Sequence, residues 1–210
     1  NVNFLTGEHP MNAIEAARNA NGPCDNRHHI AHLQVVHPHD LPRFRKLGVT
    51  ANAQALWACN DKQMTNLTLP FLGETRSDWQ YPFGSLVASG ATLAMGSDWP
   101  VSTPNPLSQI EDAVNRVPPK ERYIDPLLPK EALDLSTALR AFTSGSAWVN
   151  GDDLAGRIAI GARADLALLD RDIFDSPQRV ADASVLRTIA SGKTVFTKST
   201  EYGEASVERS

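Results

Sequence analysis

The sequence predicts an α/β protein built around a parallel sheet, and three observations support that class. Short apolar runs alternate with segments of helical pattern over residues 1–117. Gly22, Gly48 and Gly90 follow the expected ends of three helices, a position where glycine is favoured. Successive apolar runs lie about 30 residues apart, which fits the βα unit of a (β/α)8 barrel or of a doubly wound sheet. Spacing alone leaves both folds open.

The expected elements alternate along the chain. Apolar runs predict strands at 2–5, 29–34, 49–56 and 91–98. Helices are expected at 12–19, 40–47, 82–89 and 106–117. Asp40 is expected to N-cap the second of these helices, because Pro42 follows in the first turn.

The pattern changes after Leu139. A helical stretch over 131–148 is followed by short alternating runs separated by glycines, which is typical of β-hairpins rather than of further βα units. We therefore place a boundary near Val149, so that 1–148 and 149–199 form separate units and 200–210 is a polar tail.

Composition narrows the function classes. The 210 residues are 41% hydrophobic, enough for a sizeable core, and the net charge is −4 without a basic run. Nucleic acid and acidic membranes are therefore not expected as partners. No apolar stretch reaches the ~20 residues that span a bilayer, and no signal peptide opens the chain. Cys24 and Cys59 form no CxxC pair, so we expect reduced thiols in a cytoplasmic protein.

Polar residues that close apolar runs are the candidate site residues, because active sites of parallel α/β folds lie at the carboxyl ends of strands. His32 lies nearest the end of the strand expected in the run 29–34, and Asp98 closes the run 91–98 two residues before Pro100. These two side chains can meet over one strand edge. Structural roles are the alternatives to a functional site: His32 as a hydrogen-bonded structural histidine, and Asp98 as the cap of the turn at Trp99.

Other motifs point away from a site. His37 and His39 flank Pro38 and imitate a metal-binding pair, but a solvated loop explains them better. The sequence contains no G-x-S-x-G elbow, no Walker loop and no G-x-G-x-x-G. Serine-hydrolase, phosphoryl-transfer and dinucleotide-binding functions therefore lack their signals.

Several segments together resemble the amidohydrolase superfamily: HHIAHLQ, YPFGSLVASGATLAMGSDWPV, ALRAFTSGSAW and GRIAIGARADLALLDRD. The resemblance covers about 27–197 and is nearest to the amidohydrolase-3 group of YtcJ-like and N-substituted formamide deformylase-like proteins. It implies that 1–148 is the C-terminal half of a metal-dependent (β/α)8 TIM barrel, with strands five to eight. It also implies that 149–199 is part of a small β-sandwich.

The resemblance also implies roles for residues. His32 matches the metal-binding or substrate-polarising histidine of the sixth strand, and Asp98 matches the eighth-strand aspartate that contacts metal and moves the proton of the attacking water. The implied cofactor is a divalent metal, with zinc expected and one or two ions in a full-length protein. Four further residues are expected where a wall of the substrate pocket would lie, although the tryptophans can equally be packing residues: Gln34, Gln54, Trp57 and Trp99.

The sequence also departs from the family pattern. The first-strand H-x-H pair and the fourth-strand bridging ligand are absent. Leu5 stands where the fifth-strand histidine is expected, and His9 replaces it only if the register shifts. Catalytic zinc usually has three protein ligands, so two surviving candidates predict a weak metal site.

The favoured function is hydrolysis of a non-peptide carbon–nitrogen bond in an amide, formamide or cyclic amide by a metal-activated water. The expected partner is a small-molecule substrate, and the chain is expected to be a truncated fragment that is not competent by itself. Open sheet edges would also favour association into a homo-oligomer. Two alternatives stay open: a degenerate, non-catalytic binding or structural relative, and an isomerase or deaminase on the same metal centre.

Overall fold

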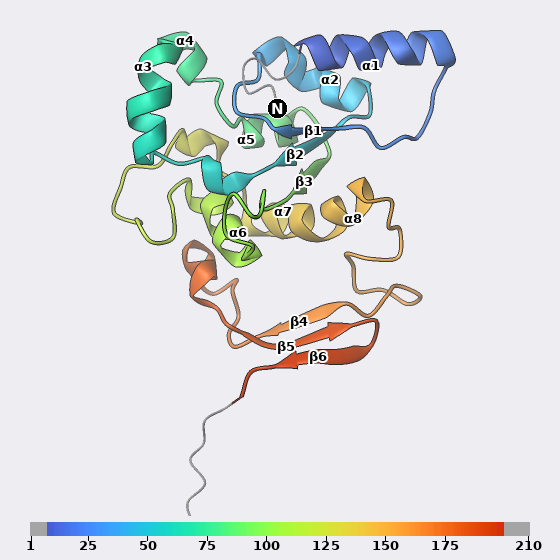
Figure 1. Ribbon diagram of the computed structural model, residues 1–210, viewed down its shortest axis with the longest axis vertical. Coiled ribbons are helices and arrows are strands. Elements are labelled where there is room, and N and C mark those ends of the chain that lie inside the picture. The colour runs from blue at the N-terminus through green and yellow to red at the C-terminus, as the bar shows by residue number, and fades with distance from the viewer. Residues whose placement is uncertain (1–7, 200–210) are drawn as a thin grey trace, which may run out of the picture.

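The computed structural model describes residues 8–199, and these contain two three-stranded sheets (Figure 1). The first sheet has the order β1 (His29–His32), β2 (Thr50–Ala53), β3 (Leu93–Met95), and both pairings are parallel. The predicted α/β class with a parallel sheet is therefore confirmed for the described residues. The strand expected at 2–5 lies outside them.

The register of the parallel sheet aligns the carboxyl ends of its strands. His32 pairs with Ala53, and Ala53 pairs with Met95. Each of these three residues is the last in its strand. The segments that follow β1, β2 and β3 therefore leave the sheet at one common edge.

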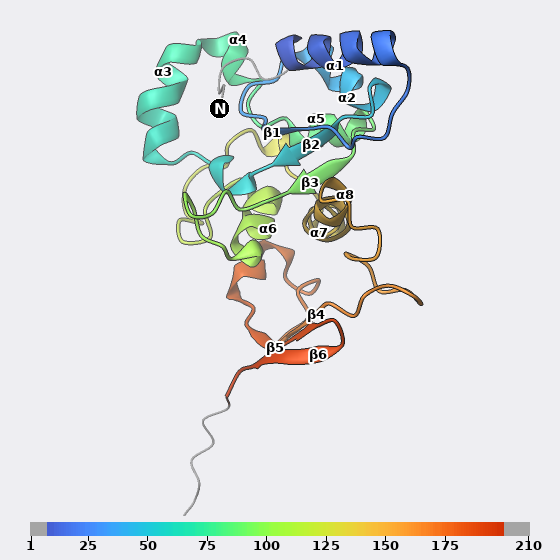
Figure 2. The ribbon, with the colours of Figure 1, turned by 45° about the vertical axis from the view of Figure 1, so that its right-hand side comes forward.

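The helices predicted between the strands are present. They are α1 (Glu8–Asn21), α2 (Leu41–Lys46), α5 (Phe83–Ala88) and α6 (Pro106–Asn115). Figures 1 and 2 show α1 and α2 on one side of the sheet and α6 on the other. Gly48 and Gly90 adopt φ values of 58° and 82° just after α2 and α5, so each occupies a left-handed position that favours glycine.

The expected cap at Asp40 is wrong. Residues Pro38–Asp40 form a 3-10 turn that runs directly into α2, so Asp40 already has helical backbone angles of φ −86° and ψ −18°. Its carboxylate does not cap the helix and instead accepts a 2.7 Å hydrogen bond from Arg43 Nη1. An N-cap needs extended backbone geometry, which the preceding turn prevents.

Helical turns between β2 and α5 were not predicted. A π-helical turn at Met64–Thr68 leads into α3 (Leu69–Leu72), and α4 (Glu74–Ser77) follows after Gly73. Short 3-10 turns also occur at Ala55–Trp57, Pro129–Glu131 and Pro177–Asp182.

The long helical stretch expected over 131–148 is observed in three pieces. Asp134 caps α7 (Leu135–Arg140) by accepting a 2.9 Å hydrogen bond from Thr137 N. A π-helical turn at Ala141–Gly145 then joins α7 to α8 (Ser146–Val149).

This helix lies against the free edge of β3. The amide of Ala51 bonds to Thr92 O and the amide of Gly96 bonds to Ala53 O, so the carbonyls of Leu93 and Met95 point away from β2. Ser146 Oγ donates a 2.6 Å hydrogen bond to Met95 O. A side chain at position 145 would overlap Leu93 O. Only glycine therefore allows the helix to come this close to the strand.

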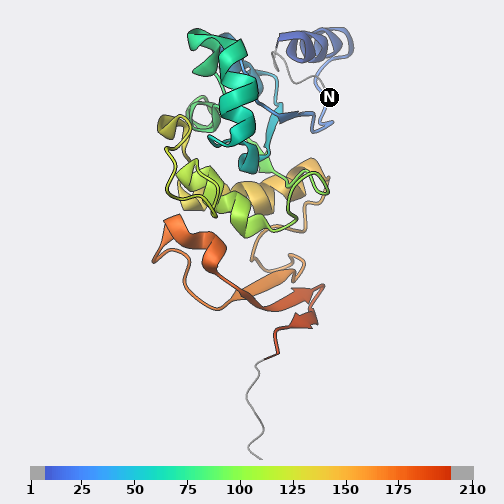
Figure 3. The same cartoon turned by 60° about the vertical axis from the view of Figure 1, so that its left-hand side comes forward.

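The second sheet is antiparallel and comprises β4 (Leu166–Leu169), β5 (Val185–Ala190) and β6 (Lys193–Thr197). The predicted hairpin character of this region is confirmed, because β5 and β6 are joined by a tight turn that contains Gly192. Figure 3 shows the second sheet well apart from the first, with α6 and α7 between them. The boundary near Val149 coincides with the end of α8, but the division into units stays a prediction.

The buried carboxylate of Glu111 joins the C-terminal part to α6. Glu111 is fully buried and accepts hydrogen bonds from Arg122 Nε at 2.6 Å and Nη2 at 2.9 Å. Its second oxygen also accepts a 2.8 Å bond from Ala181 N. Ile173 and Val180 extend this contact into the main core.

Two further expectations concern cysteines and membranes. Cys24 and Cys59 are both free, the first exposed and the second buried. Among residues 8–199, no helix is both long enough and apolar enough to cross a bilayer.

We expect the substitution Gly145→Ala to lower the free energy of unfolding by roughly 1–3 kcal/mol, because the added methyl group overlaps the backbone of β3. Urea unfolding measures this loss. The control is Ser136→Ala on an exposed position of α7, which should change stability by about 0.5 kcal/mol or less. Equal stability of the two variants would contradict the close approach of the helix to the strand.

Candidate functional site

A pocket of about 330 Å³ lies at the carboxyl edge of the parallel sheet, and both His32 and Asp98 line it. His32 is the last residue of β1, and Asp98 follows β3 by three residues. The remaining lining comes from the two segments after β1 and β3 and from the helical segment after β2: Gln34, Trp57, Asp61, Gln63, Met64, Thr68, Tyr81 and Val101.

Both candidate residues have left-handed backbone conformations. His32 has φ 70° and Asp98 has φ 55°, a region that is uncommon for residues other than glycine. Non-glycine residues in this region cost free energy and concentrate at functional sites. The turn after Asp98 is held by other groups, because Trp99 N bonds to Ser97 Oγ at 3.2 Å and Val101 N bonds to Asp98 O at 2.8 Å. Neither of these two bonds involves the Asp98 carboxylate.

Gln54 connects the ends of β1 and β2. Its Oε1 accepts a 2.7 Å hydrogen bond from the amide of His32, and its Nε2 donates a 3.0 Å bond to Asn52 Oδ1. The same Nε2 lies 3.7 Å from the position of a Cβ on Gly96, just beyond β3. Gln54 is buried, so its amide is used to position the strand ends rather than to line the pocket.

The other predicted wall residues separate into two groups. Gln34 and Trp57 line the pocket together with His32 and Asp98. Trp99 is 64% exposed and is not among the residues that line it. Gln54 and Trp99 were expected in the pocket wall, but neither lines this pocket. The roles assigned to all six residues stay predictions.

Asp61 and Tyr81 line the pocket but were missed from the sequence. Asp61 starts the unpredicted helical segment after β2, and its Oδ1 accepts a 2.7 Å hydrogen bond from Met64 N. An aspartate three residues before the first buried helical position is a recognised N-terminal signal, and it could have revealed both the helix and this carboxylate.

Buried ionisable groups lie close to the pocket. Asp112 on α6 is fully buried, and neither of its carboxylate oxygens has a hydrogen-bond partner. Burial raises the pKa of Asp112 to about 8, the positive charge of Arg116 opposes this rise, and the negative charges of Glu111 and Asp61 add to it. Arg116 Nη1 in turn donates a 3.2 Å bond to Tyr81 O, which connects this group to the pocket wall.

The same buried environment affects two neutral acids. Burial raises the pKa of the Cys59 thiol to about 12, and the charges of Asp112 and Asp61 contribute. Burial also raises the pKa of the Tyr81 hydroxyl well above its usual range. Neither side chain ionises near neutral pH.

The described residues do not complete a metal site. Imidazole and carboxylate are donors that zinc accepts, and His32 and Asp98 supply one of each. Within 8–199, however, no group of three or more His, Cys, Asp and Glu side chains is placed to hold a metal ion. Leu5 lies outside the described residues, and His9 belongs to the first turn of α1.

The His37–Pro38–His39 segment makes loop contacts. His37 Nδ1 accepts a 3.2 Å hydrogen bond from the amide of His39, and the His37 ring packs edge-on against Trp79 with centroids 4.7 Å apart. These contacts agree with the prediction that the segment is a connection.

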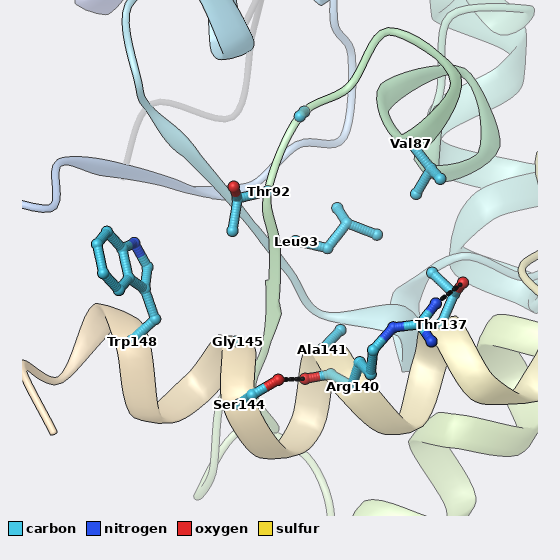
Figure 4. A pocket seen from close by; sticks show the side chains of 10 residues that line it. Val87, Thr92, Leu93, Thr137, Arg140, Ala141, Ser144, Gly145 and Trp148 are labelled. Carbon is cyan, nitrogen blue, oxygen red and sulfur yellow. Dashed lines mark hydrogen bonds between the residues drawn. The ribbon is translucent and has the colours of Figure 1, made fainter. Parts of the chain in front are cut away.

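A second pocket lies near the opposite end of β3 (Figure 4). Thr92 and Leu93 at the start of the strand face the helical residues Arg140, Ser144 and Trp148 across a space of about 310 Å³. Its lining contains no His, Cys, Asp or Glu. It therefore lacks the acid and base groups of the pocket that holds His32 and Asp98.

Comparison with known families finds one matching family model. The model describes the amidohydrolase family and matches residues 6–196.

Three curated proteins are similar to most of this chain. Protein LONG AFTER FAR-RED 3 of Arabidopsis thaliana is 34% identical over 188 residues, which cover 89% of this chain and 31% of that protein. Putative amidohydrolase YtcJ of Bacillus subtilis is 27% identical over 94% of this chain and 37% of its own length. N-substituted formamide deformylase of Arthrobacter pascens is 28% identical, with 87% and 33% covered. The chain thus spans about a third of the length of these relatives.

Solved structures share the fold. Metal-dependent hydrolases from Pyrococcus furiosus and Pyrococcus horikoshii OT3 match with TM-scores of 0.60 and 0.61 at 29% and 28% identity. Each match covers 79% of this chain and about a third of the other, at 31% and 32%. Atrazine chlorohydrolase TrzN from Arthrobacter aurescens TC1, complexed with zinc, matches with a TM-score of 0.57 at 20% identity, covering 85% and 38%. At that identity the likeness concerns the fold alone.

The buried Asp112 predicts a pH-dependent stability. Its pKa rises from 3.8 to about 8 on folding, so between these pH values the unfolded chain carries a charge that the folded chain lacks. This group therefore lowers the free energy of unfolding as pH rises from about 4 to about 8. We expect Asp112→Asn to remove that contribution and to flatten the profile measured by urea unfolding at pH 5 and pH 8. The exposed control Asp175→Asn should leave the profile unchanged, and an unchanged profile in Asp112→Asn would contradict the assignment.

Proposed function

Because the chain belongs to the amidohydrolase family, we propose that it supplies part of the active site of a metal-dependent hydrolase that cleaves non-peptide carbon–nitrogen bonds. The substrates would be amides, formamides or cyclic amides. The observation that carries the proposal is that His32 and Asp98, which follow different strands, line the same pocket at the carboxyl edge of the sheet. The formamide deformylase among the relatives acts, by its name, on this kind of bond.

Asp98 is the proposed general base and acid. Its carboxylate takes a proton from the attacking water as the new carbon–oxygen bond forms. It then gives that proton to the leaving nitrogen as the carbon–nitrogen bond breaks. The products are a carboxylic acid and an amine. His32 is proposed to orient the carbonyl oxygen, with its backbone held by Gln54.

The proposed cofactor of the whole protein is a divalent metal, zinc in the first instance. Two solved neighbours are named metal-dependent hydrolases, and zinc accepts both imidazole and carboxylate ligands. The described residues offer at most two ligands from the pair His32 and Asp98, whereas catalytic zinc usually has three from the protein. We therefore propose that this chain alone is not competent and that further ligands come from segments such as those the longer relatives contain.

The finer fold assignment belongs to the same proposal. We assign β1, β2 and β3 to strands six to eight of a (β/α)8 barrel. The sheet of β4, β5 and β6 would be part of a small β-sandwich. The matches to about a third of the Pyrococcus hydrolases support this assignment.

One observation favours a second candidate, a non-catalytic binding module. Within the described residues no set of three metal ligands converges. A relative that had lost its metal would retain the pocket as a binding site without the hydrolytic step.

The metal content of the purified 210-residue chain distinguishes weak from tight binding. We expect well below one equivalent of zinc after dialysis against zinc-free buffer, because two ligands hold the ion poorly. Elemental analysis gives the ratio, and a His32→Ala/Asp98→Ala double variant gives the background. One tightly bound equivalent that the double variant lacks would contradict the proposed incompetence.

In the complete protein that carries this sequence, Asp98→Asn should lower kcat for amide hydrolysis by about 10²–10⁴-fold, because the amide side chain cannot transfer the proton. Chelation should abolish turnover, and added Zn²⁺ should restore it. The exposed control Asp175→Asn should retain full activity. Unchanged turnover in Asp98→Asn would rule out Asp98 as the base.

A further inference from the structure

Another space, distinct from the pocket in Figure 4, adjoins the pocket that holds His32 and Asp98. It measures about 320 Å³, and Gln34, Gln63 and Thr68 line both spaces. The shared residues form a common wall, so a ligand that fills the first space can extend into the second. Each space alone is within the size range of small-molecule sites.

The two spaces differ in chemistry. The first contains His32, Asp61 and Asp98, whereas the second has no charged residue in its lining. Apart from the shared wall, the second is lined by apolar side chains alone: Val35, Leu67, Phe71 and Leu72. We call the part of the second space that these four residues line the apolar hollow. Acid and base chemistry is therefore confined to one end of the combined site.

The apolar hollow has a buried floor and an exposed rim. Val35 and Leu72 are 3% and 6% exposed, whereas Leu67 and Phe71 are 69% and 75% exposed. Large apolar side chains grouped at a cavity mouth mark a place where apolar ligand surface is buried. Leu67 belongs to the π-helical turn Met64–Thr68, a distortion that is common at functional sites.

We propose that the substrates of this site are amides that carry an elongated apolar substituent, such as a linear alkyl chain. The amide group lies beside His32 and Asp98, and the substituent passes Gln63 and Thr68 into the apolar hollow. This inference rests on the proposed function and adds the substrate class to it. No lysine or arginine lines either space, so an anionic substituent would find no partner there.

The test is a titration of the 210-residue chain with N-alkylacetamides from N-ethyl to N-octyl. The Kd is read from NMR shifts of the Gln34 and Gln63 side-chain amides. We expect the affinity to rise by up to about fourfold per added methylene, the gain for complete burial of the group, until the hollow is filled. An affinity that does not depend on chain length would overturn the proposal.

Two variants locate the effect. Leu67→Ser and Phe71→Ser change exposed positions, so the fold should persist, and both should flatten the dependence on chain length while leaving N-ethylacetamide binding unchanged. The control is Ile160→Ser, which is fully exposed and outside both spaces. It should retain the wild-type dependence. If affinity still rises with alkyl-chain length in both the Leu67→Ser and the Phe71→Ser variant, the proposal is overturned. It is also overturned if the only effect of these substitutions is to convert a dimer to a monomer in sedimentation.

This experiment does not depend on turnover. Loss of chain-length dependence would exclude the apolar subsite even if the complete protein hydrolyses short amides. Conversely, a normal chain-length dependence together with full activity of Asp98→Asn in the complete protein would exclude only the proposed catalytic role.

Discussion

The parallel pairing of β1, β2 and β3 is the constraint on which the site depends. Parallel strands in register end at one edge, so residues far apart in the chain reach the same pocket. Gln54 at the end of the middle strand strengthens this arrangement, because a buried amide must find partners and here finds them in His32 and Asn52. The position of His32 therefore depends on the neighbouring strand as well as on its own.

The edge of β3 is covered by the helical segment over 135–149. Exposed sheet edges invite further pairing, and natural proteins cover them. Here Gly145 allows the approach and Ser146 takes the carbonyl of Met95. The helix therefore occupies the carbonyl of Met95, which an open strand edge would leave for another strand.

The ionisable and the apolar residues of the site come from different elements. The strand ends bring His32 and Asp98, and the helical segment after β2 brings Asp61 and the apolar rim. The proposed catalytic residues thus lie at or just after strand ends, whereas the proposed apolar subsite lies on the connection after β2. In parallel α/β barrels, catalytic residues come from the ends of strands and the following loops vary between proteins, which agrees with this division. It also explains why metal ligands and substrate preference can be tested separately.

The sequence by itself determined the parallel α/β class, the three described strands of the first sheet and most helices, because periodicity and glycine positions are local signals. It also singled out His32 and Asp98, since both close apolar runs. Tertiary structure decided the rest. Asp40 does not cap α2, because a 3-10 turn precedes it. Gln54 is buried and bonds to the amide of His32, and Asp61, at the start of an unpredicted helical segment, lines the pocket. Each of these outcomes depends on a neighbouring turn or on contacts between segments, and such contacts follow from strand pairing and packing rather than from the spacing of residues along one segment.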